Sequence, residues 1–171
     1  MGCDIHSVAI DAEGKPINGG LWADGKTRNP DHEWLDDEGE PFGWRNYGVF
    51  GFLANVRNYS GVRPLDEPRG KPDDLKYDDD ADVWLGDHSF SWFSIDELEA
   101  FNYDAMMVAR RVTEHFFRAD GSYGGSNGGC TAAPNVGKAM TWREFLGDDF
   151  FYDLAELRRI GADRVVFGFD N

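Results

Sequence analysis

Several features that define other protein classes are scarce or missing in this chain of 171 residues. Its two cysteines, Cys3 and Cys130, are too few for a disulfide framework and fit a reducing compartment. No apolar run approaches the roughly 20 residues of a membrane span, and we recognise no secretory signal peptide. Basic residues are also few, since 17 face 32 acidic ones and leave a formal net charge of −15. Such a surface repels phosphate backbones, which disfavours non-specific binding of DNA or RNA.

Apolar and aromatic residues, in contrast, are plentiful. Hydrophobic residues make up 41% of the chain and aromatic residues 15%, enough for the core of a single globular domain over residues 1–171. We expect an α+β fold, in which a small antiparallel or mixed sheet includes the N- and C-terminal strands. Three to five helices with long loops would pack against this sheet. The sequence has no internal repeat and no domain boundary.

The first ten residues have the pattern of a β-strand with an acid and an imidazole at its head. A side-chain period of two places Asp4 and His6 on one side, about 7 Å apart. Such a pair could hold a metal, position a water or move a proton; polar residues facing solvent at a strand end are the alternative. Residues 164–171 form another strand by their β-branched and aromatic content. We expect the two strands to pair and to bring Asp170 near Asp4 and His6.

A first helix is predicted from Tyr47 onward, with Asn46 as its N-cap. Arg57 falls on the buried stripe of this helix, seven residues after Phe50. A guanidinium in that position extends to solvent, pairs with a carboxylate or reaches a bound anion. Before this helix, a short strand at residues 20–23 could form a hairpin with the first strand.

Residues 62–87 form a long proline-rich segment with little periodicity. A connection of this length is typical of a lid or binding loop. Arg63, Arg69 and Lys71 make it the densest positive cluster in the first hundred residues, which favours anion binding as much as ordinary loop solubility. Directly after it, His88 precedes a helix start, where a ligand or catalytic histidine is as well placed as a structural one.

Two capping boxes mark helix starts in the second half of the chain. Ser94 with Glu97 forms the first, and Thr141 with Glu144 forms the second. A further helix is predicted from a cap at Asp148 to Ile160, with Gly161 as its terminator. Fourfold spacing of Met107, Arg111 and His115 indicates a helix over 104–117, and the glycines of 121–129 indicate a flexible loop.

The candidate site residues come from separate segments of the chain. The catalytic candidates are Asp4, His6 and His88; the metal ligands are Asp4, His6, His88 and Asp170; the ligand-binding residues are Tyr47, Arg57, Asn58, Arg69 and Trp92. Carboxylates and imidazoles at one centre suit a divalent metal such as zinc or manganese. One mechanism is hydrolysis by a metal-bound water, with arginine stabilising the phosphoryl oxygens. A metal-free version uses His6 and His88 as general base and acid.

Six short motifs distinguish the sequence. They are Met1-Gly-Cys-Asp-Ile-His6, Arg45-Asn-Tyr47, Phe50-x-x-Leu-Ala-x-Val-Arg-Asn58, Arg69-Gly-x-Pro72, His88-Ser-x-Ser-Trp92 and Val166-Phe-x-Phe-Asp-Asn171. Together they resemble a widespread family of small phage and prophage proteins whose members begin Met-Gly-Cys-Asp-Ile-His. The resemblance spans most of the chain, while residues 104–140 look peculiar to this member. It implies a phage accessory protein in the cytoplasm of an infected bacterial host, and by analogy an anti-defence role.

Three functions follow as hypotheses. The first is a hydrolase that cleaves a phosphodiester bond of a nucleotide or cyclic nucleotide signal. The second is a non-catalytic protein that binds such a signal and sequesters it from the host. The third is an acidic protein that binds and inhibits a basic host protein, for which the charge of −15 is the support. We expect a small nucleotide-like ligand and no membrane contact, and the sequence is compatible with a homo-oligomer.

Overall fold

The computed structural model describes residues 2–17, 39–76, 84–111, 114–127 and 137–171. Its elements are β1 (Ile5–Ile10), α1 (Tyr47–Ala54), β2 (His88–Ser94), α2 (Ile95–Ala100), β3 (Met106–Ala109), β4 (Glu114–Phe117), β5 (Tyr123–Asn127), β6 (Lys138–Thr141), α3 (Trp142–Leu146), α4 (Asp148–Arg159) and β7 (Arg164–Phe169). This confirms the expected α+β fold with a sheet that includes both terminal strands. None of the helices in these ranges has the length and apolar composition that crossing a membrane requires.

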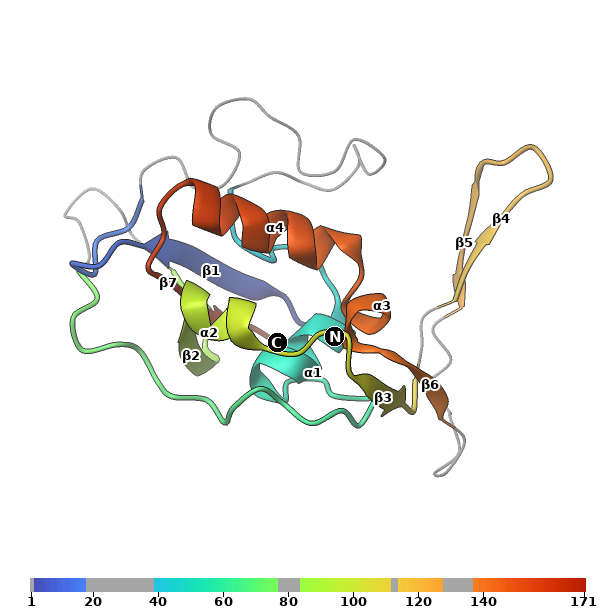
Figure 1. Cartoon of the computed structure of the whole chain (residues 1–171), viewed down its shortest axis with the longest axis horizontal. Coiled ribbons are helices and arrows are strands. Elements are labelled where there is room, and N and C mark those ends of the chain that lie inside the picture. The colour runs from blue at the N-terminus through green and yellow to red at the C-terminus, as the bar shows by residue number, and fades with distance from the viewer. Residues whose placement is uncertain (1, 18–38, 77–83, 112–113, 128–136) are drawn as a thin grey trace.

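The central sheet has three antiparallel strands in the order β1-β7-β2. The C-terminal strand lies in the middle, so that Val166 faces Val8 on one side and Trp92 on the other. The predicted pairing of the two terminal strands is therefore confirmed, and both chain ends lie close together (Figure 1). Because the strands are antiparallel, β1 and β2 both begin at the end of the sheet where β7 terminates.

The large hydrophobic core lies on one face of this sheet. Alternate residues of β1 and β7 point into it, including Ile5, Phe167 and Phe169, which are at most 1% exposed. All four helices contribute buried side chains to the same core. Aromatic rings dominate it, as in the stacked pair of Phe42 and Phe150 with ring centroids 4.8 Å apart.

The opposite face of the sheet is covered by the long connection between α1 and β2. Leu85 from this connection is buried against Ile10 and Val166. The Leu85 carbonyl passes directly over Gly168, where an added Cβ atom would lie only 2.2 Å from the carbonyl oxygen. Glycine at this position of β7 therefore makes room for the backbone that crosses the sheet.

Helix starts follow the local sequence signals. The Asn46 side chain accepts hydrogen bonds from the first turn of α1, and both predicted capping boxes are formed at Ser94 and Thr141. The N-cap of α4 differs from the prediction, because it is Gly147 and no side chain caps this helix. With φ at +80°, Gly147 lets α3 turn into α4 through a single residue, which places Asp148 inside the helix.

The helix predicted over 104–117 is wrong. Its two halves form β3, which pairs with β6, and β4, which pairs with β5. The β5 strand itself lies in the glycine-rich segment that we expected to be a flexible loop. Pairing with β6, which is distant in sequence, and with the nearby β5 overrides the weak helical spacing here. The β4–β5 ribbon projects away from the central sheet (Figure 1). The strand predicted at 20–23 and the second cysteine, Cys130, lie outside the described residues.

Candidate functional site

Polar residues from five segments gather at the end of the sheet where β7 terminates and β1 and β2 begin. Phe169, the last residue of β7, lies between Ile5 of β1 and His88 of β2. The loops at both ends of α1 reach the same end of the sheet through Arg45 and Arg57. We call this cluster the strand-end site; it comprises Cys3, Asp4, His6, Arg45, Arg57, His88, Asp170 and Asn171. It joins residues from five of the six short motifs that distinguish the sequence.

His6 and Asp170 form the central pair of the strand-end site. His6 Nε2 lies 3.2 Å from Asp170 Oδ2, and the Asp4 backbone N–H donates to Asp170 Oδ1 at 2.8 Å. This N–H lowers the pKa of Asp170, and His6 and Arg45 act in the same direction. Asp170 is therefore a carboxylate at neutral pH, held on one oxygen and facing the imidazole with the other. The His6 side chain is 18% exposed, so the pair is reachable from solvent.

The Asp4 side chain is occupied by an arginine rather than by His6. Arg45 Nε donates to Asp4 Oδ1 at 2.7 Å and Arg45 Nη2 to Asp4 Oδ2 at 2.6 Å. This two-pronged contact raises the pKa of Arg45 further above its usual value. Gly2 packs against the same guanidinium, because an added Cβ atom would lie 2.6 Å from Arg45 Nη1. Asp4 therefore contributes to the central pair through its backbone.

Two further residues contact His6 that the sequence did not single out. Glu40 Oε1 lies 3.8 Å from His6 Nδ1, and the Trp84 ring lies 4.3 Å from the imidazole, centroid to centroid. Both residues come from long connections, far from His6 in sequence. No periodicity or motif marks them, since only the folded arrangement of the connections brings them to the strand end.

His88 reaches the same end of the sheet from the other face. It pairs in register with Phe169, and the two rings are stacked at 6.2 Å, whereas His6 pairs with Gly168. Successive residues of a strand point to opposite faces, so the two imidazoles do too. His88 Nδ1 lies 2.9 Å from Ser89 Oγ, while Nε2 is buried without a hydrogen-bond partner. The strand-end site thus brings His6 and Asp170 together but separates them from His88.

Arg57 is held at the strand-end site by neutral partners. Its guanidinium donates to the Tyr59 hydroxyl at 3.2 Å and to Asn171 Oδ1 at 3.5 Å, and it lies near the buried Cys3 thiol. Within the described ranges, no carboxylate forms an ion pair with it. Its φ of +46° is unusual for a side chain of this size. The Tyr59 hydroxyl raises the pKa of Arg57, while burial raises the pKa of Cys3.

Two of the predicted ligand-binding residues have structural contacts near α1. Asn58 closes the loop after the helix, since its side chain donates to the Val62 carbonyl at 2.7 Å and accepts from the Val62 N–H at 3.0 Å. Tyr47 packs edge-on against Tyr59 with ring centroids 5.8 Å apart. It therefore supports the ring that carries the hydroxyl bound by Arg57.

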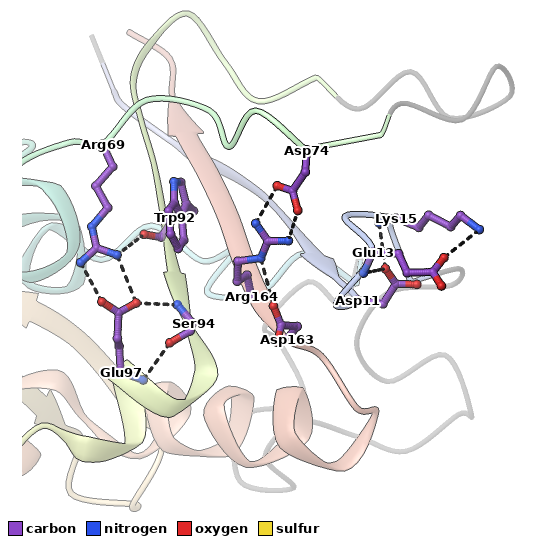
Figure 2. Close-up of polar contacts among 10 residues, drawn as sticks. All are labelled: Asp11, Glu13, Lys15, Arg69, Asp74, Trp92, Ser94, Glu97, Asp163 and Arg164. Atoms are coloured by element: carbon purple, nitrogen blue, oxygen red, sulfur yellow. Dashed lines mark hydrogen bonds and ion pairs between the residues drawn. The ribbon is translucent and has the colours of Figure 1, made fainter.

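Arg69 and Trp92 lie together in a hollow farther along β2 and β7 (Figure 2). The hollow measures about 590 Å³ and is lined by Arg69, Lys71, Pro72, Asp73, Asp74, Trp92 and Arg164. The guanidiniums of Arg69 and Arg164 lie 5.1 and 5.6 Å from the Trp92 ring centroid. Glu97 binds Arg69 at 2.8 Å, and Asp74 binds Arg164 at 2.6 Å. Carboxylates thus already neutralise both guanidiniums.

The strand-end site has the groups for proton transfer and for anion binding, in the form of an imidazole oriented by a carboxylate and a guanidinium with neutral partners. Among the residues that the structure describes, no group of three or more His, Cys, Asp or Glu side chains is arranged to hold a metal ion. The metal ligation predicted for Asp4, His6, His88 and Asp170 therefore stays a prediction.

In comparisons with known proteins, the chain matches no protein-family model, no curated protein and no solved structure.

Proposed function

We propose that this protein hydrolyses a phosphodiester bond of a nucleotide or cyclic nucleotide, with His6 as the general base. The observation that carries the proposal is the 3.2 Å contact of His6 Nε2 with an Asp170 carboxylate that the Asp4 N–H holds in place. A carboxylate in this position fixes the tautomer of the imidazole and stabilises its protonated form. With its Nε2 proton directed at Asp170, His6 accepts a proton at Nδ1.

The reaction that fits this pair is attack of water on phosphorus. His6 Nδ1 takes the proton of the attacking water, the new P–O bond forms, and the bond to the leaving oxygen breaks. That oxygen then receives the proton from His6 or from solvent. Arg57 supplies a charge for a substrate phosphate, because its partners Tyr59 and Asn171 are neutral and a guanidinium fork matches phosphate oxygens.

A turnover assay tests this proposal. The protein is incubated with a panel of cyclic mononucleotides, cyclic dinucleotides and their linear forms, in zinc, in manganese and with a chelator, and the products are separated by chromatography. We expect cleavage of at least one substrate and a loss of about 100-fold or more in His6→Gln. Asp170→Asn should also lose activity. Its matched control is Asp163→Asn, because Asp163 pairs with Arg164 outside the site. Intact substrate under every metal condition would overturn the proposal.

Binding without cleavage is the second candidate function. It is favoured by one observation, that the strand-end site contains a guanidinium for phosphate but separates His88 from His6. Within the described ranges, His88 is therefore not placed to act as the acid for His6. A sequestering protein needs only the guanidinium. A nucleotide recovered chemically unchanged after the complex is heated would support sequestration over hydrolysis. Either activity fits an anti-defence accessory protein of a phage in its host's cytoplasm.

A further inference from the structure

An exposed indole lies directly beside the proposed catalytic pair. Trp84 is 55% exposed, although its ring contacts the His6 imidazole with centroids 4.3 Å apart and planes inclined at 43°. Apolar surface in contact with water is unfavourable, so a molecule that covers this ring gains free energy in proportion to the area it buries. The indole contacts the His6 ring, and the exposed part of its surface is available to a molecule that binds at the strand-end site.

The backbone that carries Trp84 is fixed on its C-terminal side. Leu85 is 1% exposed in the apolar cluster on the second face of the sheet. Gly86 follows with φ at +77°, and an added Cβ atom there would lie 2.4 Å from the Phe169 carbonyl oxygen. The Asp87 N–H donates to this same oxygen at 2.7 Å. Trp84 is therefore attached to a segment that is clamped onto β7 next to the His6–Asp170 pair.

We propose that Trp84 stacks on the base of the nucleotide whose phosphodiester bond lies at His6. The inference rests on the proposed function and narrows its substrate class to phosphodiesters that carry a nucleobase. Stacking on an aromatic ring holds any base by its π-face, so Trp84 supplies affinity with little preference among bases. In the proposed complex the base lies on the indole while the phosphate faces His6.

The two aromatic side chains among the predicted ligand-binding residues, Tyr47 and Trp92, are less available for stacking. The Trp92 ring has the guanidiniums of Arg69 and Arg164 close to it, and Tyr47 packs against Phe50 and Tyr59. Neither of them contacts His6. Trp84 has both the exposure and the position that a stacking residue needs.

Binding measured by calorimetry in the His6→Gln chain tests the inference without turnover. The probes are cyclic di-AMP, 5′-AMP and the base-free ribose 5-phosphate. We expect Trp84→Ala to weaken binding of the two adenine nucleotides by about 5- to 100-fold, the range that loss of one stacked base gives. Trp84→Phe should recover most of the affinity, and ribose 5-phosphate should bind equally to all variants. Tyr152→Ala is the control, because it removes an exposed aromatic ring elsewhere in the protein, on α4.

The outcomes separate this inference from the proposed function. Unchanged nucleotide affinity in Trp84→Ala overturns the stacking role, and so does an equal loss for ribose 5-phosphate, because that loss would come from a disturbed site. Failure of the His6→Gln chain with Trp84 intact to bind either adenine nucleotide overturns it as well. Stacking that depends on Trp84 in a protein without turnover supports the inference and overturns the hydrolase. Where turnover occurs, Trp84→Ala should raise KM and leave kcat nearly unchanged.

Discussion

At the scale of single residues, Asp170 connects the stability of the protein to the chemistry of the strand-end site. The Asp4 N–H, His6 and Arg45 all lower its pKa in the folded state. An unfolded Asp has a pKa of about 3.9, so the contribution of Asp170 to stability is complete above that pH. It is lost as the pH falls through the lower pKa of the folded state.

Asp170→Asn should therefore reduce stability more at pH 7 than at pH 3. The variant lacks the charge that the Asp4 N–H and His6 stabilise, while the original chain loses the same charge on acidification. Urea unfolding of both proteins at several pH values between 7 and 3 measures the gap in free energy. A gap that stays constant over this range would mean that the Asp170 charge has no role in stability.

The backbone conformation of Arg57 is unfavourable for a residue that carries a side chain. At φ +46° a glycine has no steric penalty, whereas a side chain does. We expect Arg57→Gly to change the free energy of unfolding by no more than about 1 kcal/mol, since relief of this strain offsets the lost contacts. Nucleotide binding should fall by tenfold or more, and Arg57→Lys should recover only part of it. Equal affinity in calorimetry would remove Arg57 from the site.

Sequence reasoning at this scale identified some of the residues that meet in the strand-end site and missed others. Asp4, His6 and Asp170 were correctly expected to meet, because strand pairing of the two termini fixes their positions. Glu40 and Trp84 were missed, since they reach His6 through connections whose path no local signal determines. The face on which His88 lies depends on a register shift in β2, which the sequence does not mark.

At the scale of elements, Gly168 and the segment that crosses it link β7 to the strand-end site. The Leu85 carbonyl would lie 2.2 Å from a Cβ atom at position 168, and Leu85 is the neighbour of Trp84. Gly168→Ala should cost about 1–3 kcal/mol of stability, as overpacking in a core does, and should also weaken nucleotide binding. The Phe90 side chain also lies beside this position, but the nearest atom belongs to the Leu85 backbone. Phe90→Leu should therefore not relieve the loss. Urea unfolding of the single and double variants measures the change in the free energy of unfolding. Unchanged stability in Gly168→Ala would contradict the close passage of the Leu85 backbone over Gly168.

Local signals predicted helix starts well and strands poorly. The capping boxes at Ser94 and Thr141 need only residues three apart, so they can be read directly from the sequence. The β2 strand was not expected, because its residues were read only as the approach to the helix that follows. Residues 104–117 were assigned to a helix because β6, the partner of β3, is distant in sequence, and because β5, the partner of β4, lies in a glycine-rich segment that we expected to be a loop.

At the scale of the whole molecule, the net charge of −15 controls which partners approach. We expect no retardation of duplex DNA in a gel shift at about 50 mM salt, because the protein and the phosphate backbone repel each other. A basic protein should bind better, in a manner that salt weakens. A DNA complex at this salt would contradict the electrostatic account, and failure of every basic host protein to bind at low salt would remove the inhibitor hypothesis.

The central claim is that Asp170 acts on the substrate through His6. A double-mutant cycle on the turnover of the best cyclic nucleotide tests this most directly, with the original chain, His6→Gln, Asp170→Asn and the double variant compared under one condition. Residues that work as a unit lose activity non-additively. We predict that Asp170→Asn lowers kcat/KM strongly alone and has no further effect when His6 is already Gln. Losses that add, or a His6→Gln protein as active as the original, would contradict the account.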